Sequence, residues 1–456
     1  MNLKIIGLGY KDGDISLNGE KALKKSDCIL LKSEKFASAQ FLKKGGYTYT
    51  ALDDFFEKAE DFDALNAAII DHVKEVSSRY RNAVYLVHGS GIDDATSVAL
   101  QKEGAELLAG VSSSAYALNA LYCDKVHSEA VAATPSFIEV GAYELTDTPC
   151  LFFDRRFGLI VKDIDNIFTA AEVKLRLSDI LGDVPVLLMT GEGKVTALSL
   201  YALDGQKKSA YGYKTVLIVP PSDYLSNKVH DMSDLYLIMK RLRAPDGCKW
   251  DAAQTHKSIA INAIEEAYEL ADAIDRDEPA FILEESGDVL LQAVFHAIIA
   301  EDENEFSLYE MITALCEKLL SRHTHIFGDD KAANAAEALA VWEKAKKKEK
   351  KYKNHTDKMH SVPISFPAVL RAEKVQKTAE KSGIGASDTE DAGERLKASV
   401  SEFLRAGDDE AYAAAGRLLF AATDAVRKRG IEGESALREA VNAFIETFAA
   451  DEQRES

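Results

Sequence analysis

The sequence predicts a multidomain protein with an α/β N-terminal half and an all-helical remainder. Over residues 1 to about 220, short apolar runs alternate with amphipathic stretches, which is the pattern of α/β domains. From about Met232 onward, strand-like runs are almost absent. Pro220-Pro221-Ser222 separates the two regions, because consecutive prolines do not readily continue a strand or a helix. A chain of 456 residues has room for about two to four domains.

Three segments of the N-terminal half share one pattern, a predicted strand that runs into glycines. They are residues 2–9, 83–91 and 184–191. A glycine at the end of a strand lets the backbone approach a bound ligand closely. Tight turns between strands and helices also use glycine, so the pattern alone leaves both interpretations open.

Taken together, the glycine loops over residues 1–222 resemble those of the tetrapyrrole (corrin/porphyrin) methylase family. The matching pieces are Gly7-Leu8-Gly9 with Asp14, Gly89, and Gly110-Val111-Ser112-Ser113. The resemblance implies two α/β lobes that bind S-adenosylmethionine between them. The cofactor-binding residues that it implies are Gly7, Gly9, Asp14, Gly89, Ser112 and Ser113.

Two of these loops depart from the family pattern. Tyr10-Lys11-Asp12-Gly13-Asp14 is longer and bulkier than the family's Pro-Gly-Asp. His88-Gly89-Ser90-Gly91 lacks the acid and the proline of the family's Gly-Asp-Pro. The fold can survive these loop changes, so we expect it to be retained. Methyl transfer from S-adenosylmethionine to a tetrapyrrole-like or other acceptor stays open as an alternative function.

The helical half contains two acid pairs at matched spacing, Glu265-Glu266-x-x-Glu269 and Glu285-x-x-Asp288. Residues three apart on a helix lie on neighbouring positions of one face, so each pair can direct two carboxylates to one point. Two such helices packed together would collect four carboxylates, which a hard divalent cation such as Mg²⁺ would bind and neutralise. In a chain with 75 acidic residues, acid pairs on solvated helix faces are also common.

The residues after the second pair favour the metal interpretation. Residues 289–300 are apolar on nearly every face, which is typical of a helix in the middle of a bundle. Asp277, Glu278 and Pro279 supply a start for this helix. We therefore expect its first acids to face protein, where their charge must be compensated.

Further motifs flank the acid pairs in a fixed order. They are residues 242–251 (LRAPDGCKWD), residues 254–256 (QTH), Lys318, residues 321–328 (SRHTHIFG) and Trp342-Glu343-x-x-Lys346. With the acids between them, these motifs resemble the MazG-type nucleoside triphosphate pyrophosphohydrolases, all-α enzymes that use Mg²⁺. The family usually has proline where Lys249 and Thr324 stand.

This resemblance implies cleavage of a nucleoside triphosphate into the monophosphate and pyrophosphate, with Mg²⁺ or Mn²⁺. It also implies a homodimer, since the family builds its active bundle from paired units. Each basic or aromatic residue has a plainer interpretation: Lys318 and Arg322 as a surface basic pair, and Trp250 as a core aromatic. The implied roles are Glu266, Glu269, Glu285 and Asp288 as metal ligands, Glu265 as an auxiliary acid or base, Lys318 and Arg322 as catalytic and phosphate-binding residues, and Trp250 as a wall for the base.

The last part of the chain resembles a second MazG domain whose acid motifs have eroded. It follows the lysine-rich residues 344–360, which read as a solvated helix end and a connector. Glu402 survives from the first acid motif, and Arg417 stands in place of a ligand acid. The fixed charge of Arg417 predicts that the metal site is dead and that the domain serves packing or dimerisation. Alternatively, Arg417 binds a phosphate or an acid of a partner subunit. The expected domains are residues 1–222, 233–350 and 363–450.

Composition restricts the possible partners and the setting. The net charge of −20 and the pI of about 5.0 oppose binding of nucleic-acid polymers. The five cysteines show no C-x-x-C spacing, so neither a disulfide framework nor a zinc site is expected from them. The start of the chain reads as a strand rather than a signal peptide, and no apolar run approaches the length of a membrane span. We therefore expect a soluble, cytoplasmic protein.

Three hypotheses follow for the whole chain. The first is a Mg²⁺-dependent nucleoside triphosphate pyrophosphohydrolase with an N-terminal domain of unassigned role. In the second, the methylase-like half is the active part. In the third, the chain is a nucleotide-sensing scaffold that binds without turnover.

Overall fold

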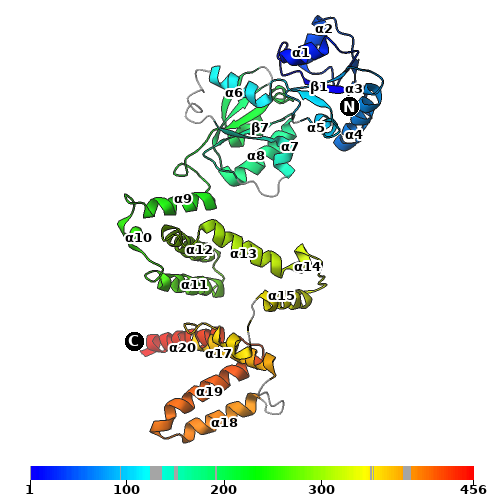
Figure 1. Ribbon diagram of the computed structural model, residues 1–456. Coiled ribbons are helices and arrows are strands. Elements are labelled where there is room, and N and C mark those ends of the chain that lie inside the picture. Colours follow the sequence, from blue (N-terminus) through cyan, green and yellow to red (C-terminus); the bar gives the residue numbers. More distant parts are fainter. Residues whose placement is uncertain are drawn as a thin grey trace. The chain divides into compact units, whose positions relative to one another are not determined.

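The computed structural model describes the chain in two compact units, Met1–Leu308 and Tyr309–Ser456, each of which is considered by itself (Figure 1). Helices follow two sheets in the first unit, and the second unit is helical, so the predicted fold class is confirmed. The domain limits expected from the sequence stay predictions. The described residues are 2–92, 94–123, 136–147, 153–190, 193–349, 352, 354–383 and 392–455.

The first sheet has five parallel strands in the order β3-β2-β4-β1-β5. Successive side chains of a strand point to opposite faces. In β1, Ile5 therefore packs with the core on one face, and Ile6 with the core on the other. Both faces are apolar, as parallel sheets covered by helices require. The strands are β1 (Leu3–Gly7), β2 (Cys28–Leu31), β3 (Thr50–Ala51), β4 (Ala83–Val87) and β5 (Glu106–Leu108), and the helices are α1 (Leu17–Leu23), α2 (Gln40–Lys44), α3 (Asp53–Lys58), α4 (Phe62–Ser77) and α5 (Ala95–Lys102).

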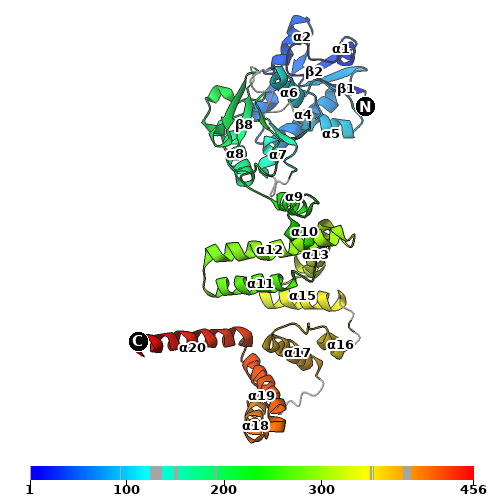
Figure 2. The same cartoon turned by 90° about the vertical axis from the view of Figure 1, so that its left-hand side faces the viewer.

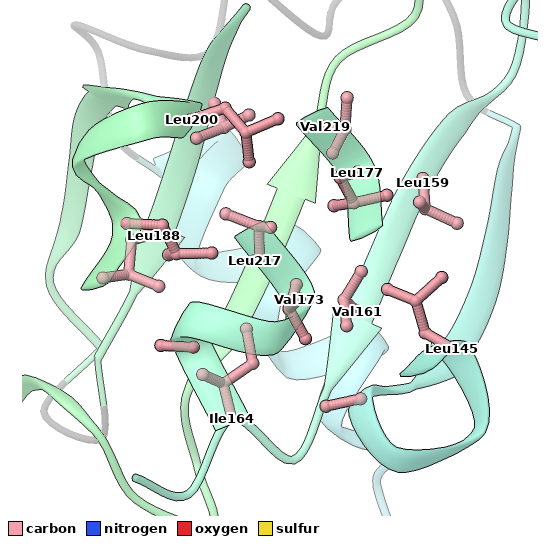
Figure 3. Close-up of a cluster of buried hydrophobic side chains, with 14 of the residues drawn as sticks. Leu145, Leu159, Val161, Ile164, Val173, Leu177, Leu188, Leu200, Leu217 and Val219 are labelled. Carbon is pink, nitrogen blue, oxygen red and sulfur yellow. The ribbon is translucent and has the colours of Figure 1, made fainter. Parts of the chain in front are cut away.

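The second sheet is mixed, with the order β6-β7-β10-β8-β9. Its β6–β7 pair is parallel and the other pairs are antiparallel. Figure 3 shows Val161, Leu188 and Leu217 on the face that packs with Val173 and Leu177 of α8. The elements are α6 (Ser113–Cys123), β6 (Phe137–Gly141), α7 (Ala142–Asp147), β7 (Gly158–Lys162), α8 (Ile167–Leu181), β8 (Pro185–Met189), β9 (Val195–Ser199) and β10 (Val216–Val219).

A buried arginine ties the second sheet region to the first helix of the helical part. The guanidinium of Arg155 donates to the carbonyl oxygens of Val229 and Ile180, and its nitrogens lie 3.6 Å and 3.7 Å from carboxylate oxygens of Asp231 and Asp234. Asp231 caps α9 (Met232–Arg243) in a capping box with Asp234. The start of α9 is thereby fixed against the α/β region.

The remaining helices of the first unit are α10 (Lys249–Ala253), α11 (Ala260–Asp275) and α12 (Pro279–Asp302). The short connection over residues 276–278 makes α11 and α12 an antiparallel hairpin, which is seen side by side in both views (Figures 1 and 2). Pro279 stands in the first turn of α12, as predicted, where its missing N–H costs nothing.

The second unit is helical over all of its described residues that have regular structure. In α17, the buried carboxylate of Glu373 accepts a 2.7 Å hydrogen bond from the Gly433 backbone N–H and so caps the first turn of α20. Helices α18 and α19 form a hairpin. The helices are α13 (Leu308–Arg322), α14 (Thr324–Phe327), α15 (Ala335–Glu349), α16 (His355–His360), α17 (Ala368–Ser382), α18 (Ala392–Arg405), α19 (Asp408–Lys428) and α20 (Gly433–Glu455).

The three predicted strand-to-glycine segments are strands β1, β4 and β8. No described helix combines the length and the apolar character needed to cross a membrane. Cys28, Cys123, Cys248 and Cys316 are free thiols. Gly191, Cys150 and three lysines of the predicted connector, Lys350, Lys351 and Lys353, lie outside the described residues.

Candidate metal centre

Three of the predicted metal ligands meet on the α11–α12 hairpin. One carboxylate oxygen each of Glu266, Glu285 and Asp288 lies within 4.8 Å of the other two. The helical spacing of the sequence accounts for this, because Glu285 and Asp288 share one face of α12, and Glu266 faces them from α11. All three side chains are half-buried.

The fourth predicted ligand, Glu269, lies beside this cluster and is exposed. It makes a side-chain hydrogen bond with Glu266, and its charge acts on both Glu266 and Glu285. Glu265, the predicted auxiliary acid or base, is exposed and acts on Glu266 through its charge. The structure therefore brings Glu266, Glu285 and Asp288 together, and the charges of Glu265 and Glu269 act on this cluster.

The electrostatics of the cluster are unfavourable when all of its acids are ionised. Partial burial, followed by the charges of Asp288 and Glu269, raises the pKa of Glu266. Partial burial, followed by the charges of Glu269 and Glu284, raises the pKa of Glu285. Like charges and lost hydration both disfavour the charged form. A divalent cation bound to these oxygens would relieve both effects.

The donor set fits Mg²⁺ or Mn²⁺. All of its atoms are carboxylate oxygens, the ligands that these hard cations take in proteins. The half-exposed position also leaves coordination positions for water or for phosphate oxygens, as substrate-binding Mg²⁺ sites require. Glu266, Glu285 and Asp288 would hold the ion.

The sequence predicted that α12 lies in the middle of a bundle, but only part of the helix is buried. From Gln292 onward the helix is largely buried, but Leu283 is 77% exposed, and Phe281 and Leu290 are exposed as well. The described chain thus covers the C-terminal half of this apolar helix and leaves the apolar side chains near the acids uncovered.

The other predicted residues of this site are placed differently. Trp250 in α10 is 60% exposed, which rules out the plainer interpretation as a core aromatic within the described chain. Lys318 is exposed, and Arg322 is only 8% exposed. Both belong to the second unit, whereas the acids belong to the first.

Arg322 has partners that the sequence did not indicate. Its Nε and Nη2 donate to the two carboxylate oxygens of Glu349 at 2.8 Å and 3.0 Å. Its guanidinium also lies 5.4 Å from the ring centre of Trp342. The hydrogen bonds to Glu349 raise the pKa of Arg322. A role on phosphate would require Arg322 to exchange this carboxylate for a phosphate group.

In the C-terminal segment that was predicted to resemble a degenerate MazG domain, Arg417 and Glu402 form an ion pair. The guanidinium of Arg417 donates from Nε and Nη2 to one oxygen of Glu402, at 3.0 Å and 2.7 Å. The hydrogen bond to Glu402 raises the pKa of Arg417. An internal cation therefore neutralises the surviving acid.

The predicted cofactor loops of the N-terminal half also converge. Gly9 and Gly89, which follow β1 and β4, form a backbone bridge with N–H to carbonyl distances of 2.9 Å and 3.2 Å. A Cβ on Gly7 would lie 2.4 Å from the Ser90 carbonyl oxygen and 2.5 Å from the Gly110 nitrogen. These glycines permit close approach of the loops to one another.

The polar members of these loops have structural partners. Asp14 accepts hydrogen bonds from the backbone N–H groups of Tyr10 and Lys11. Ser112 precedes α6, and its Oγ accepts from the N–H of Ala115 at 3.1 Å, the pattern of an N-cap. Ser113 is buried. Binding of S-adenosylmethionine by these residues stays a prediction.

Sequence reasoning missed an aromatic cluster beside these loops. The His88 ring lies 4.3 Å from the ring of Tyr10, 4.7 Å from Phe36 and 4.7 Å from Tyr213, between ring centres. Tyr10 in turn stacks on Tyr116. Tyr10, from the longer and bulkier first loop, is thus packed against His88 at the start of the second loop.

The helical half of the chain is similar in sequence to known proteins. The profile of the MazG nucleotide pyrophosphohydrolase domain matches residues 254–327, which contain both acid pairs. A nucleoside triphosphate pyrophosphohydrolase/pyrophosphatase MazG of Thermotoga maritima is 38% identical over 48% of this chain and 85% of its own length. The chain belongs to the MazG family. A nucleoside triphosphate pyrophosphohydrolase of Escherichia coli is 35% identical over 48% of this chain and 86% of its own length.

A longer relative covers more of the chain. The uncharacterized protein YabN of Bacillus subtilis is 31% identical over 82% of this MazG-family chain and 76% of its own length. That match extends into the α/β half. Among solved structures, a uroporphyrin-III C-methyltransferase of Thermus thermophilus covers 48% of this chain and 95% of its own, with 17% identity and a TM-score of 0.36.

A substitution at Gly7 tests the packing of the glycine loops. We expect Gly7→Ala to lower the free energy of unfolding by about 1 to 3 kcal/mol, because the new Cβ overlaps backbone atoms that cannot move independently. Gly205→Ala is the matched control, since a Cβ at that position would meet nothing within 4 Å. Chemical denaturation of both variants measures the difference, and equal stability would contradict the described packing.

The raised pKa values predict a pH dependence of stability in chelator. A carboxyl group whose pKa is raised on folding favours the folded state less as pH rises above its ordinary value of 4.5, because the folded state then binds more protons than the unfolded state. Glu266→Gln removes one such group. Its stability relative to the wild type should therefore increase between about pH 4.5 and 7.

Unfolding of both proteins at a series of pH values measures this difference. Millimolar Mg²⁺ should remove the advantage of the variant, because the ion stabilises only the wild-type carboxylate cluster. A difference in stability that does not change with pH would contradict the proposed repulsion.

Proposed function

We propose that this chain hydrolyses nucleoside triphosphates to the monophosphate and pyrophosphate, using Mg²⁺ or Mn²⁺ held by the α11–α12 hairpin. The observation that carries the proposal is the convergence of Glu266, Glu285 and Asp288 within 4.8 Å. Family membership supports it, because the Thermotoga maritima and Escherichia coli relatives are named as nucleoside triphosphate pyrophosphohydrolases.

Each acid of the hairpin has a role in this proposal. Glu266, Glu285 and Asp288 bind and orient the cation, and Glu269 adjoins them. The bound ion would offset the charge of the polyphosphate and lower the pKa of a coordinated water. Glu265 accepts the proton of the attacking water, whose oxygen joins one phosphorus as the bond between the α and β phosphates breaks. If the α phosphorus is attacked, pyrophosphate leaves with the bridging oxygen. If the β phosphorus is attacked, the monophosphate leaves with it.

The remaining residues bind the substrate. Trp250 has an exposed ring that can cover a base. Lys318 can reach phosphate as a point charge, and Arg322 can do so after exchanging Glu349 for phosphate oxygens.

We include a homodimer and a cytoplasmic location in the proposal. The exposed apolar residues near the acids, Phe281, Leu283 and Leu290, are a surface that a second copy could cover. The net charge of −20 supports a small-molecule substrate in place of a nucleic-acid polymer. Binding of S-adenosylmethionine by the N-terminal half is the alternative function, supported by the convergence of its glycine loops. Saturable binding of this cofactor by the full chain would support it.

The direct test is the product pattern with each of several nucleoside triphosphates, with Mg²⁺ and with chelator. We expect pyrophosphate and monophosphate in equal amounts, with Mg²⁺ only. Glu266→Ala and Asp288→Ala should each lower kcat/KM by about 100-fold or more, since even partners outside a coordination sphere contribute about 10- to 100-fold.

Asp277→Asn provides the matched control, because it changes an exposed acid of the connection between α11 and α12 outside the cluster, and asparagine also tolerates the left-handed conformation there. It should retain near wild-type activity. Release of inorganic phosphate without pyrophosphate, or full activity in both alanine variants, would contradict the proposal.

A further inference from the structure

A second group of metal-binding side chains lies at the other end of α12. One ring nitrogen of His256 and one carboxylate oxygen each of Glu303 and Glu305 lie within 4.8 Å of one another. Glu303 is about 15 residues beyond Asp288, which corresponds to about 22 Å along a helix that rises 1.5 Å per residue. This group is therefore separate from the carboxylate cluster.

The turn that ends α12 brings the two glutamates to His256. The backbone N–H of Glu305 donates to the Ala300 carbonyl at 2.9 Å, and that of Asn304 donates to Glu301 at 3.1 Å. Asn304 has φ 58°, the left-handed conformation of a helix C-terminal motif. The position occupied by Glu305 usually carries an apolar residue that packs on the helix. Here it presents a carboxylate beside an imidazole.

His256 is held in place by contacts that need no ion. The Arg243 guanidinium donates to the carbonyl oxygens of Asp251 and Gln254 at 2.5 Å and 3.2 Å, and to Asp302 at 2.8 Å. These bonds fasten the segment before His256 to the end of α12. The Nδ1 atom of His256 also lies 2.8 Å from the Nδ1 atom of His296, and the planes of the two rings are 6° from parallel.

The other nitrogen of His256 has no hydrogen-bond partner among the described residues. Its Nε2 atom is buried and makes no hydrogen bond. If His256 donates from Nδ1 to His296, the Nε2 lone pair is unused. If His296 donates, His256 carries its proton on Nε2, and Glu305 is 4.0 Å away, too far to accept it. A buried polar group is left unsatisfied in either tautomer, which is costly.

We propose that His256, Glu303 and Glu305 bind a transition-metal dication, with Zn²⁺ as the best match. A cation on Nε2 satisfies the unused lone pair of the first tautomer. The bond from Nδ1 to His296 then fixes that tautomer and the ring orientation, as partners of metal-bound histidines commonly do. One imidazole with two carboxylates is a ligand set that Zn²⁺ accepts, and the imidazole discriminates against Mg²⁺.

The site uses no cysteine, so the cysteine spacing of the chain does not bear on it. Its ligands join the segment before α11 to the C-terminal end of α12. The ion therefore clamps the segment after α10, the helix that carries Trp250, to the hairpin, at a distance from the carboxylate cluster. This role is independent of the proposed hydrolysis.

The test is a calorimetric titration of the full chain with Zn²⁺ in saturating Mg²⁺, which occupies the carboxylate cluster. We expect one tight Zn²⁺ site per chain. His256→Gln should weaken it by about 100-fold or more, and His296→Phe by about 10-fold, because the second change removes only the orienting partner. Asp288→Asn should leave it intact. His355→Gln, which removes an exposed histidine of α16, is the matched control and should also bind normally.

Co²⁺ provides an independent readout, because its visible spectrum reports nitrogen and oxygen ligation directly. Glu305→Gln alters an exposed side chain and should lose the Co²⁺ spectrum while folding normally, which distinguishes ligand loss from misfolding. Equal Zn²⁺ affinity in the wild type and His256→Gln would overturn the proposal. So would a site that Asp288→Asn abolishes and His256→Gln does not, because the ion would then occupy the carboxylate cluster.

Discussion

The mutual repulsion of carboxylates on the α11–α12 hairpin is the constraint on which the rest of the helical half depends. Three acids whose oxygens lie within 4.8 Å of one another repel each other when all are ionised in a half-buried position. The apolar C-terminal half of α12, buried from Gln292 onward, holds the hairpin together against that repulsion. A metal-binding function is the simplest reason for a sequence to keep acids so placed.

Much of this site could be predicted because it is local. The i, i+3 spacing of Glu285 and Asp288 sets their common face, and the short connection makes their helix the neighbour of α11. The rotation of α11 about its own axis is set by tertiary packing, so the sequence did not distinguish the half-buried Glu266 from the exposed Glu269. The pairing of Arg322 with Glu349 likewise joins residues 27 positions apart, beyond the reach of periodicity.

The N-terminal half shows the same division between local and tertiary information. Strand patterns predicted β1, β4 and β8, and glycines predicted close approach at their ends. The sequence did not predict which parts of the protein lie against these glycines. At Gly7 the neighbour is another loop of the protein, and at Gly89 it is the side chain of Tyr10. The His256–His296 contact spans 40 positions and carried no motif that named it.

Binding of Mn²⁺ to the full chain tests the central claim most directly, because this ion is a paramagnetic substitute for Mg²⁺ at oxygen sites. The account predicts Mn²⁺ binding that Mg²⁺ displaces and that the double substitution of Glu266→Gln with Asp288→Asn abolishes, while the fold is retained. His256→Gln should bind Mn²⁺ as the wild type does. Mn²⁺ affinity that is unchanged in the double variant would contradict the account and leave the five acids of the hairpin as a solvated surface.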